Sequence, residues 1–191
     1  MDMNLYSKKP KYKKMLRGLL FWILEIAGVI LAAYLIIEYA VDKTTMLGNS
    51  METTLKNGDK IIVNKLAYIR KGPDRYDVIV FKQSGKEHSY YSIKRVIGIP
   101  GDTVEIVDGF VYINGVKLEE EIKVEPMRLA GLAAEPITLE EEEYFVLGDN
   151  RNASEDSRFA NIGLIVRDDI VGEAWLRLNP FSIIKKINRE D

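Results

Sequence analysis

Few residues in this chain could do covalent chemistry. The sequence has no cysteine and a single histidine, His88, so disulfides, thiolate nucleophiles and cysteine-ligated metals are excluded. One histidine cannot build a typical zinc site, and no His-Glu-x-x-His motif is present. Catalysis would therefore depend on hydroxyls, carboxylates, lysines or His88, and we expect neither a metal nor a cofactor.

One serine has the surroundings of a reactive hydroxyl. Ser50 lies in the stretch GNSMETTL, residues 48–55, where a glycine and an asparagine favour a turn. A serine needs a neighbouring base to become a nucleophile. His88 lies in the polar stretch QSGKEHSYY, without the nearby carboxylate that orients a triad histidine. A lysine is therefore the favoured base, and His88 stays open as the alternative.

A lysine can act as a base only if its pKa falls well below its free value of about 10.4. Burial in an apolar pocket removes water from the ammonium and lowers the pKa by up to about 3–5 units. Lys94 meets this requirement, because Ile93, Val96 and Ile97 flank it in the stretch YSIKRVIG. Lys65, in VNKLAY, is a weaker competitor. For both lysines, an ordinary solvated strand position remains the alternative interpretation.

A third stretch, GDNRNASEDSRF at residues 148–159, is dense in charged and hydroxyl side chains and follows an apolar segment. Such a loop suits a hydrogen-bonded, charge-paired network that holds a backbone and a lysine in place. Asparagine, aspartate and serine are also common in ordinary surface turns. Composition alone does not separate the two interpretations.

The elements that position these residues begin with a long apolar segment. Residues 1–18 carry six basic side chains and one acid, and residues 19–41 then contain only two charged residues, Glu25 and Glu38. A helix of this length is roughly 34 Å long, which is enough to cross a bilayer. The sequence therefore predicts a transmembrane segment over residues 19–41.

The basic flank predicts how the chain is oriented in the membrane. Residues 1–18 are expected to remain in the cytoplasm as a basic tail, which places residues 42–191 outside. The sequence Glu-Tyr-Ala at residues 38–40 is a poor cleavage site for a secretory signal. We therefore interpret residues 19–41 as an uncleaved signal anchor in a single-pass protein of the cell membrane.

The pattern after residue 41 predicts strands. Six short stretches are rich in β-branched and aromatic residues, namely 59–69, 76–82, 90–99, 103–118, 143–149 and 170–178. Dipeptides such as Asn-Gly and Pro-Gly separate them and favour turns. The pattern predicts a mainly β, antiparallel ectodomain of sandwich or barrel type, with a small loop-rich insertion around residues 103–142.

The charge of the ectodomain limits its partners. Residues 42–191 contain 21 basic and 26 acidic residues, a net charge of −5. A nucleic-acid-binding surface would be basic, so we expect no nucleic acid partner. The acidic runs at 119–121 and 140–143 are most simply solvated faces. The sequence defines no oligomeric state.

Four stretches, taken in order after a single apolar anchor, resemble the successive boxes of the type I signal peptidases. They are GNSMETTL, GDKIIVNK, YSIKRVIGIPGD and GDNRNASEDSRFANIGLI. These enzymes are membrane-anchored Ser/Lys proteases that cleave signal peptides from exported preproteins. The single span and the short connection between residues 102 and 144 resemble Gram-positive enzymes more than the larger, two-span Gram-negative ones. The resemblance implies a signal peptidase fold and preprotein substrates.

The resemblance also implies roles for individual residues. Ser50 would be the nucleophile and Lys94 the general base, acting through an acyl-enzyme. The Ser50 backbone N–H would be one oxyanion donor. A hydroxyl that orients the lysine amine and two ion pairs would support this dyad, and these residues are Ser154, Asp149 with Arg95, and Asp156 with Arg158.

Two positions depart from the family pattern. Gly48 occupies the place of a serine that supplies the second oxyanion donor in many relatives, so that donor is undefined. Thr53 replaces the proline of Ser-Met-x-Pro-Thr, which loosens the turn by about 0.4–1 kcal/mol but removes no catalytic group. An inactive anchored domain that binds export substrates or partners is therefore the alternative function. A self-cleaving regulator would need a DNA-binding segment in place of the span.

The substrate is expected to bind as an extended strand, with small residues at the first and third positions before the cut. Ser50 follows residue 41 closely enough to lie within roughly 30 Å of the membrane face. The residues expected to contact substrate are Met46, Leu47, Gly48, Met51, Leu55, Tyr91 and Ile93, although apolar side chains such as these more commonly belong to a core. An apolar rim at Met46 and Leu47 would touch the lipid bilayer.

Overall fold

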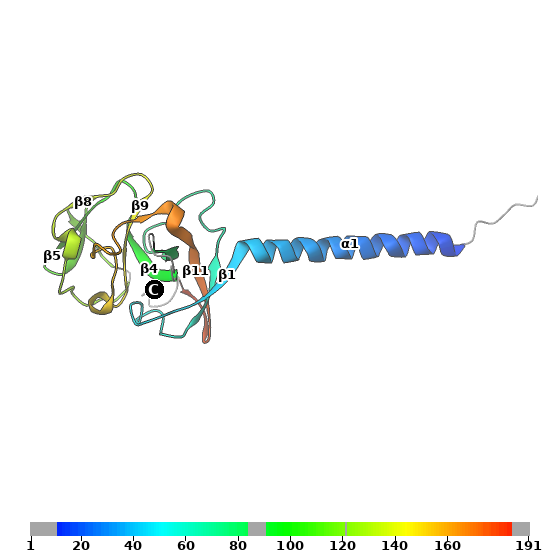
Figure 1. Ribbon diagram of the computed structural model, residues 1–191, viewed down its shortest axis with the longest axis horizontal. Helices are drawn as coiled ribbons and strands as arrows, with labels where there is room; N and C mark the ends of the chain where they lie inside the picture. The colour runs from blue at the N-terminus through cyan, green and yellow to red at the C-terminus, as the bar shows by residue number, and fades with distance from the viewer. Residues whose placement is uncertain (1–10, 84–90, 121, 185–191) are drawn as a thin grey trace, which may run out of the picture. The chain divides into compact units, whose positions relative to one another are not determined.

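The computed structural model describes residues 11–83, 91–120 and 122–184. The chain divides into two units, residues 1–39 and 40–191. The described part of the first unit is one helix, α1 (Lys11–Ala40), drawn in blue in Figure 1. Its residues Tyr12–Ala40 are long and apolar enough to cross a membrane, and their most apolar 18-residue window has a mean hydropathy of 2.4. The helix begins before the apolar segment because lysine, arginine and methionine in the basic flank are good helix formers.

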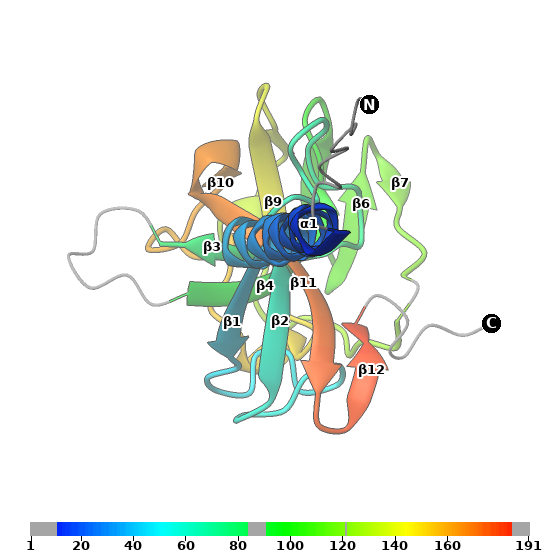
Figure 2. The same ribbon diagram turned by 90° about the vertical axis from the view of Figure 1, so that its right-hand side faces the viewer.

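The second unit is built on an antiparallel sheet of eight strands. Their order is β1-β2-β11-β3-β4-β9-β10, with β12 paired to β11, and Figure 2 shows β1, β2, β11 and β12 side by side. The bounds are β1 (Val41–Thr45), β2 (Lys60–Asn64), β3 (Val78–Lys82), β4 (Tyr91–Gly98), β9 (Glu143–Leu147), β10 (Ile165–Val166), β11 (Ile170–Leu178) and β12 (Phe181–Ile183).

A second, four-stranded sheet has the order β7-β6-β5-β8. Its strands are β5 (Thr103–Val107), β6 (Phe110–Ile113), β7 (Val116–Lys117) and β8 (Ile137–Thr138). The hairpin turns Asp108-Gly109 and Asn114-Gly115 have positive φ at both residues, the backbone that these dipeptides favour. The region expected as a loop-rich insertion therefore contains a small sheet. In the described ranges there are also three short 3-10 helices, η1 (Gly131–Ala134), η2 (Arg151–Ala153) and η3 (Arg167–Asp169).

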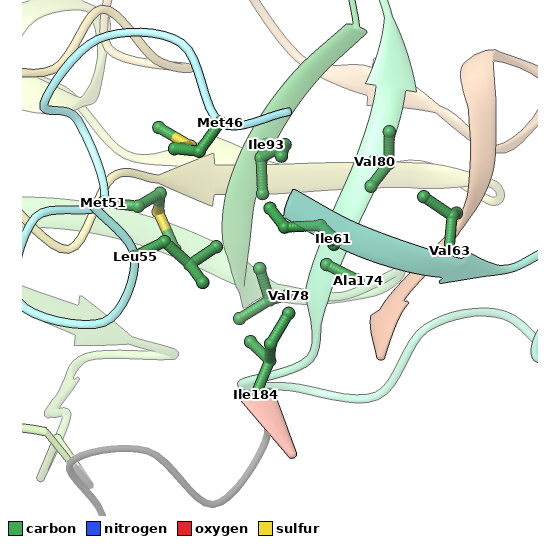
Figure 3. Packing of buried hydrophobic residues seen from close by; sticks show 10 residues of the cluster. All are labelled: Met46, Met51, Leu55, Ile61, Val63, Val78, Val80, Ile93, Ala174 and Ile184. Carbon is green, nitrogen blue, oxygen red and sulfur yellow. The ribbon is translucent and has the colours of Figure 1, made fainter. Parts of the chain in front are cut away.

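Three clusters of buried apolar side chains hold the second unit together. In the first, Met46, Met51 and Leu55 of the segment after β1 pack against side chains of β2, β3 and β4 (Figure 3). The second joins the two sheets, because it combines Ile97 and Phe145 of the large sheet with residues of β5 and β6. The third covers the other face of β3, β4 and β9. The predicted mainly β, antiparallel domain after one apolar helix is confirmed.

The strand that carries the candidate lysine lies inside the large sheet. β4 pairs with β3 on one side and with β9 on the other. Because side chains alternate along a strand, Lys94 shares a face with Ile79, its partner on β3, while Arg95 shares the opposite face with Val78. Both faces are covered by apolar clusters. Each of these two charged side chains therefore has to find polar partners inside the protein.

Candidate active site

Ser50 lies in the turn that follows β1, and its backbone is held from two sides. The N–H groups of Thr54 and Leu55 donate to the carbonyl of Met51 at 2.8 and 2.6 Å, so a single helical turn begins directly after the serine. The Asn150 N–H donates to the Ser50 carbonyl at 3.0 Å. The polar loop after β9 therefore fixes the position of the serine.

The structure brings Lys94 to Ser50 across 44 residues of sequence. The Lys94 Nζ donates a hydrogen bond to the Ser50 Oγ at 2.7 Å. Lys94 is 7% exposed, and burial lowers its pKa from the ordinary 10.5 to about 8, against the opposing effect of the carboxylates of Asp156, Glu155 and Asp149. A substantial fraction of the amine is then neutral near pH 8, as a general base requires.

Ser154 lies near the Ser50 backbone but makes no hydrogen bond to Lys94. It is buried, and in the described part of the chain its Oγ has no hydrogen-bond partner, so the expected hydrogen bond to the Lys94 amine is absent from this structure. The hydroxyl lies over Gly148 instead. A Cβ added to Gly148 would be 2.3 Å from the Ser154 Oγ and 2.5 Å from the Ser50 carbonyl oxygen, so only glycine lets the two serines approach here.

Arg95 and Asp149 form a fully buried, bidentate ion pair. The Arg95 Nε and Nη2 donate to the two carboxylate oxygens of Asp149 at 2.8 and 2.7 Å. The Thr54 hydroxyl donates to Asp149 at 2.5 Å and accepts from Arg95 at 3.2 Å. The remaining Arg95 Nη1 donates to the Tyr76 carbonyl at 2.9 Å. This cluster ties β4 to the end of β9 and to the turn that carries Ser50.

Asp156 and Arg158 form the second expected ion pair, with both side chains buried. The Arg158 Nε and Nη2 donate to Asp156 at 2.7 and 2.9 Å. Asp156 also accepts the Gly148 N–H at 3.1 Å, and the Arg158 Nη2 donates to the carbonyl of Arg151 at 2.6 Å. The loop 148–158 is therefore folded around this pair.

The residues expected to contact substrate divide between surface and interior. Met51 and Leu55 have no exposed surface, and Met46 and Ile93 are also buried in the first apolar cluster, so the core interpretation applies to these four. Leu47 and Gly48 are exposed and Tyr91 is half-buried. Because Met46 is buried, the expected apolar rim is reduced to Leu47.

Of the two competing bases, the structure describes only Lys65. Lys65 lies in the turn after β2 and is half-buried. His88 lies outside the described residues. Among the residues that the structure describes, no group of His, Cys, Asp and Glu side chains could hold a metal ion.

Two features of the site could not be assigned from sequence. The Thr54 hydroxyl is hydrogen-bonded to both members of the Arg95–Asp149 pair. The only sequence signal for this residue was its position next to Thr53 in the first box. Glu120, expected on a solvated face, instead forms a bidentate pair with the buried Arg151, with both contacts at 2.5 Å. The partner of Glu120 lies 31 residues away in sequence, so no local pattern could reveal it.

Comparison with known proteins places this chain in a family. The model of the family described as signal peptidase, peptidase S26, matches residues 19–179. Signal peptidase IB of Staphylococcus aureus (strain Mu50 / ATCC 700699) is 34% identical over 186 residues, covering 90% of this chain and 95% of the relative. Signal peptidase I P of Bacillus subtilis subsp. natto is 34% identical over 185 residues, covering 93% of this chain and 98% of the relative.

A solved structure is also similar. The crystal structure of a signal peptidase I from Enterococcus faecalis V583 has 36% sequence identity and a TM-score of 0.44, and the match covers 54% of this chain and 97% of that one. The matched sequences are peptidases, which gives the class of the protein. The chain belongs to the signal peptidase family, peptidase S26.

Proposed function

We propose that Ser50 and Lys94 are the catalytic dyad of this protein. Its family membership makes it a membrane-anchored serine endopeptidase that removes signal peptides from preproteins. The observation that carries the residue assignment is the 2.7 Å hydrogen bond between the Lys94 Nζ and the Ser50 Oγ. Burial supports the role of Lys94, because its pKa is lowered to about 8.

The chemistry follows from this contact. Neutral Lys94 takes the proton of Ser50 as the Oγ attacks the scissile carbonyl carbon, and the Ser50 N–H stabilises the oxyanion. The tetrahedral intermediate collapses, the C–N bond breaks, and the lysine ammonium protonates the leaving amine. Lys94 then deprotonates a water molecule, which attacks the acyl carbon of the acyl-enzyme. The ester C–Oγ bond breaks, the Ser50 Oγ takes a proton from the lysine ammonium, and the signal peptide is released.

The supporting residues act on geometry. The Arg95–Asp149 pair and the Asp156–Arg158 pair fix the loop that holds the Ser50 carbonyl and surrounds Lys94. We assign to Ser154, whose Oγ lies over Gly148 near the Ser50 carbonyl oxygen, the role of orienting the amine during the reaction. The Gly48 N–H donates to Asn57 at 3.0 Å, so it is not available as the second oxyanion donor in this conformation.

The chain organisation is part of the proposal. Residues 1–18 form a cytoplasmic tail, residues 19–41 the span, and residues 42–191 the extracytoplasmic catalytic domain of a cell-membrane protein. This orientation rests on the basic flank, six basic residues against one acid before the span. The alternative of an inactive binding domain has no support from the comparisons, and Thr53 leaves the contact between Lys94 and Ser50 in place.

The test is cleavage of a preprotein by the full-length chain in detergent. We expect Ser50→Ala, Lys94→Ala and Lys94→Arg each to lose at least about 10³-fold in kcat, because an arginine cannot give up its proton. Lys65→Ala is the matched control and should retain activity. Retained activity in Lys94→Ala would contradict the assignment of the base.

A further inference from the structure

The connection between β7 and β8, residues 118–120 and 122–136, reaches the loop 148–158 through a buried ion pair. The Glu120 carboxylate accepts from the Nη1 and Nη2 of Arg151, with both contacts at 2.5 Å. The side chain of Arg151 is 1% exposed and that of Glu120 is 11% exposed. A bidentate pair of arginine and carboxylate fixes the orientation of the two groups as well as their distance. Glu120 therefore determines where the Arg151 side chain lies.

Arg151 transmits this restraint to the backbone that holds the serine. Its Nε donates to the Gly148 carbonyl at 3.1 Å. The neighbouring Asn150 N–H donates to the Ser50 carbonyl at 3.0 Å. A Cβ added to Gly148 would lie 2.5 Å from the same Ser50 oxygen, so Gly148 also lies against the serine backbone. A shift of Arg151 would therefore move both residues that contact the Ser50 carbonyl.

Side-chain packing leaves room on both sides of Arg151. A cavity of about 400 Å³ is lined by Glu52 and Thr53 of the turn after Ser50, by residues 123–125 and by residues 149–151. A second cavity, of about 510 Å³, has apolar side chains of β6 and of the connection in its wall and also borders Arg151. Because Arg151 lines both cavities, its ion pair bridges a gap that packing does not fill.

The other hydrogen bonds from this connection reach later parts of the loop. The Asn152 side chain accepts from the Arg128 N–H, and the Arg158 carbonyl accepts from the Leu132 N–H. In the described part of the chain, Glu120 is the hydrogen-bonding group of the connection that reaches the loop before Asn152. The position of that first part relative to the connection therefore depends on Glu120.

We propose that Glu120 is a positioning residue for catalysis, which acts through Arg151 to hold the backbone of Ser50 against Lys94. This role rests on the proposed dyad, since the geometry that it maintains is the contact between the lysine amine and the serine hydroxyl. The hairpin of β6 and β7 leads directly into Glu120. The small second sheet thereby supports the reaction from outside the large sheet.

Glu120→Gln keeps the shape of the side chain but removes its charge and one of the two acceptors. We expect kcat for preprotein cleavage to fall by about tenfold to a hundredfold, because a small displacement of the serine slows its attack, and KM to stay unchanged. Glu119→Gln, the same substitution at an exposed neighbour, is the matched control and should keep full activity. A raised KM with unchanged kcat in Glu120→Gln would overturn the proposal.

The route through Arg151 is tested by a double-mutant cycle. In an Arg151→Met background, adding Glu120→Gln should cause no further loss of kcat, because the group through which Glu120 acts has been removed. Losses that multiply would show that Glu120 acts by another route, and would overturn the proposal.

Hydrogen exchange separates this proposal from the assignment of the dyad, because it needs no cleavage. In the Ser50→Ala background the carbonyl of residue 50 remains, and Glu120→Gln should speed exchange of the Asn150 amide by about tenfold. The Val146 amide, which donates to the Ser157 hydroxyl, should exchange at its original rate. Unchanged exchange at Asn150 would overturn the positioning role, whichever residue is the nucleophile. Equal acceleration at both amides would show a general loss of stability and would overturn it too.

Discussion

In the proposed mechanism, the Lys94 amine sets the pH range in which the site works. Lys94 lies opposite Ile79 and is almost fully buried, and its pKa is lowered to about 8. Because the neutral amine is the reactive form, we expect kcat/KM to rise about tenfold per pH unit below pH 8 and to level off above it. A cleavage assay from about pH 6 to pH 10 measures this profile. A midpoint near 6.5, the ordinary pKa of histidine, would identify His88 as the base.

The same burial makes Lys94 a cost to stability. Its folded pKa of about 8 lies below the ordinary 10.5, so below pH 8 the folded protein has to bury a charge that the unfolded chain keeps in water. Lys94→Met removes this cost, and we expect it to raise the free energy of unfolding by about 1–3 kcal/mol at pH 7. The gain should fade between pH 8 and 10.5, where the folded amine is already neutral. Thermal denaturation at pH 7 and pH 10 checks the trend, and a gain that does not depend on pH would contradict it.

The close approach of Ser154 to the Ser50 backbone depends on the absence of a side chain at Gly148. A methyl group there would collide with the Ser154 side chain and the Ser50 carbonyl oxygen. We expect Gly148→Ala to destabilise the domain by about 1–3 kcal/mol and to lower kcat by moving Ser50 away from Lys94. Gly28→Ala is the control, since it adds the same methyl in open space where φ is not positive. If both variants lose the same activity, crowding at Gly148 is not the cause.

At the scale of elements, the Arg95–Asp149 pair joins β4, β9 and the turn after β1. Both side chains are buried, so removing one leaves an unpaired charge in the interior. We expect Asp149→Ala to cost about 3–5 kcal/mol in the free energy of unfolding, and Thr54→Val about 1 kcal/mol. Denaturant unfolding of the full-length protein measures both values. The double variant Arg95→Met, Asp149→Ala should recover part of the lost free energy of unfolding. If it recovers none, the unpaired charge of Arg95 is not the cause of the loss.

Sequence patterns predicted where strands occur better than they predicted the residues at which strands begin and end. The stretch 59–69 was expected as one strand, but β2 ends at Asn64, whose side chain accepts the Leu66 N–H and starts a turn. The strand Val41–Thr45 was missed because its polar sequence VDKTT carries no apolar alternation, and its pairing with β2 alone defines it. Periodicity reports which residues face a core, and it does not report which distant strand supplies the ladder.

For the candidate site too, local sequence patterns indicated individual residues but not how distant segments pack together. The apolar neighbours of Lys94 pointed to a buried amine, and the four boxes pointed to Ser50 as its partner. The distance between the two groups depends on how the turn after β1, strand β4 and the loop after β9 pack together, and no local pattern contains that information. Met51 and Leu55 were assigned to the substrate because of their place beside Ser50, but the helical turn after the serine points them into the core.

At the scale of the whole molecule, the proposed extracytoplasmic position of the catalytic domain rests on the basic residues that precede the apolar span at residues 19–41. The apolar span can insert in either direction, and basic residues next to it resist transfer across the membrane. In this chain those residues are Lys8, Lys9, Lys11, Lys13, Lys14 and Arg17.

Replacing all six by glutamine should leave α1 in the membrane, because Tyr12–Ala40 keeps its apolar length. It should also place a large part of the molecules with residues 42–191 in the cytoplasm, where the domain still folds but meets no exported substrate. Protease accessibility of a C-terminal tag in intact cells measures the orientation, and preprotein processing should fall in proportion to the inverted fraction. Replacing six lysine or arginine residues after residue 42 is the control, and it should leave the orientation unchanged. Unaltered topology in the glutamine variant would show that a feature other than the basic flank orients the anchor.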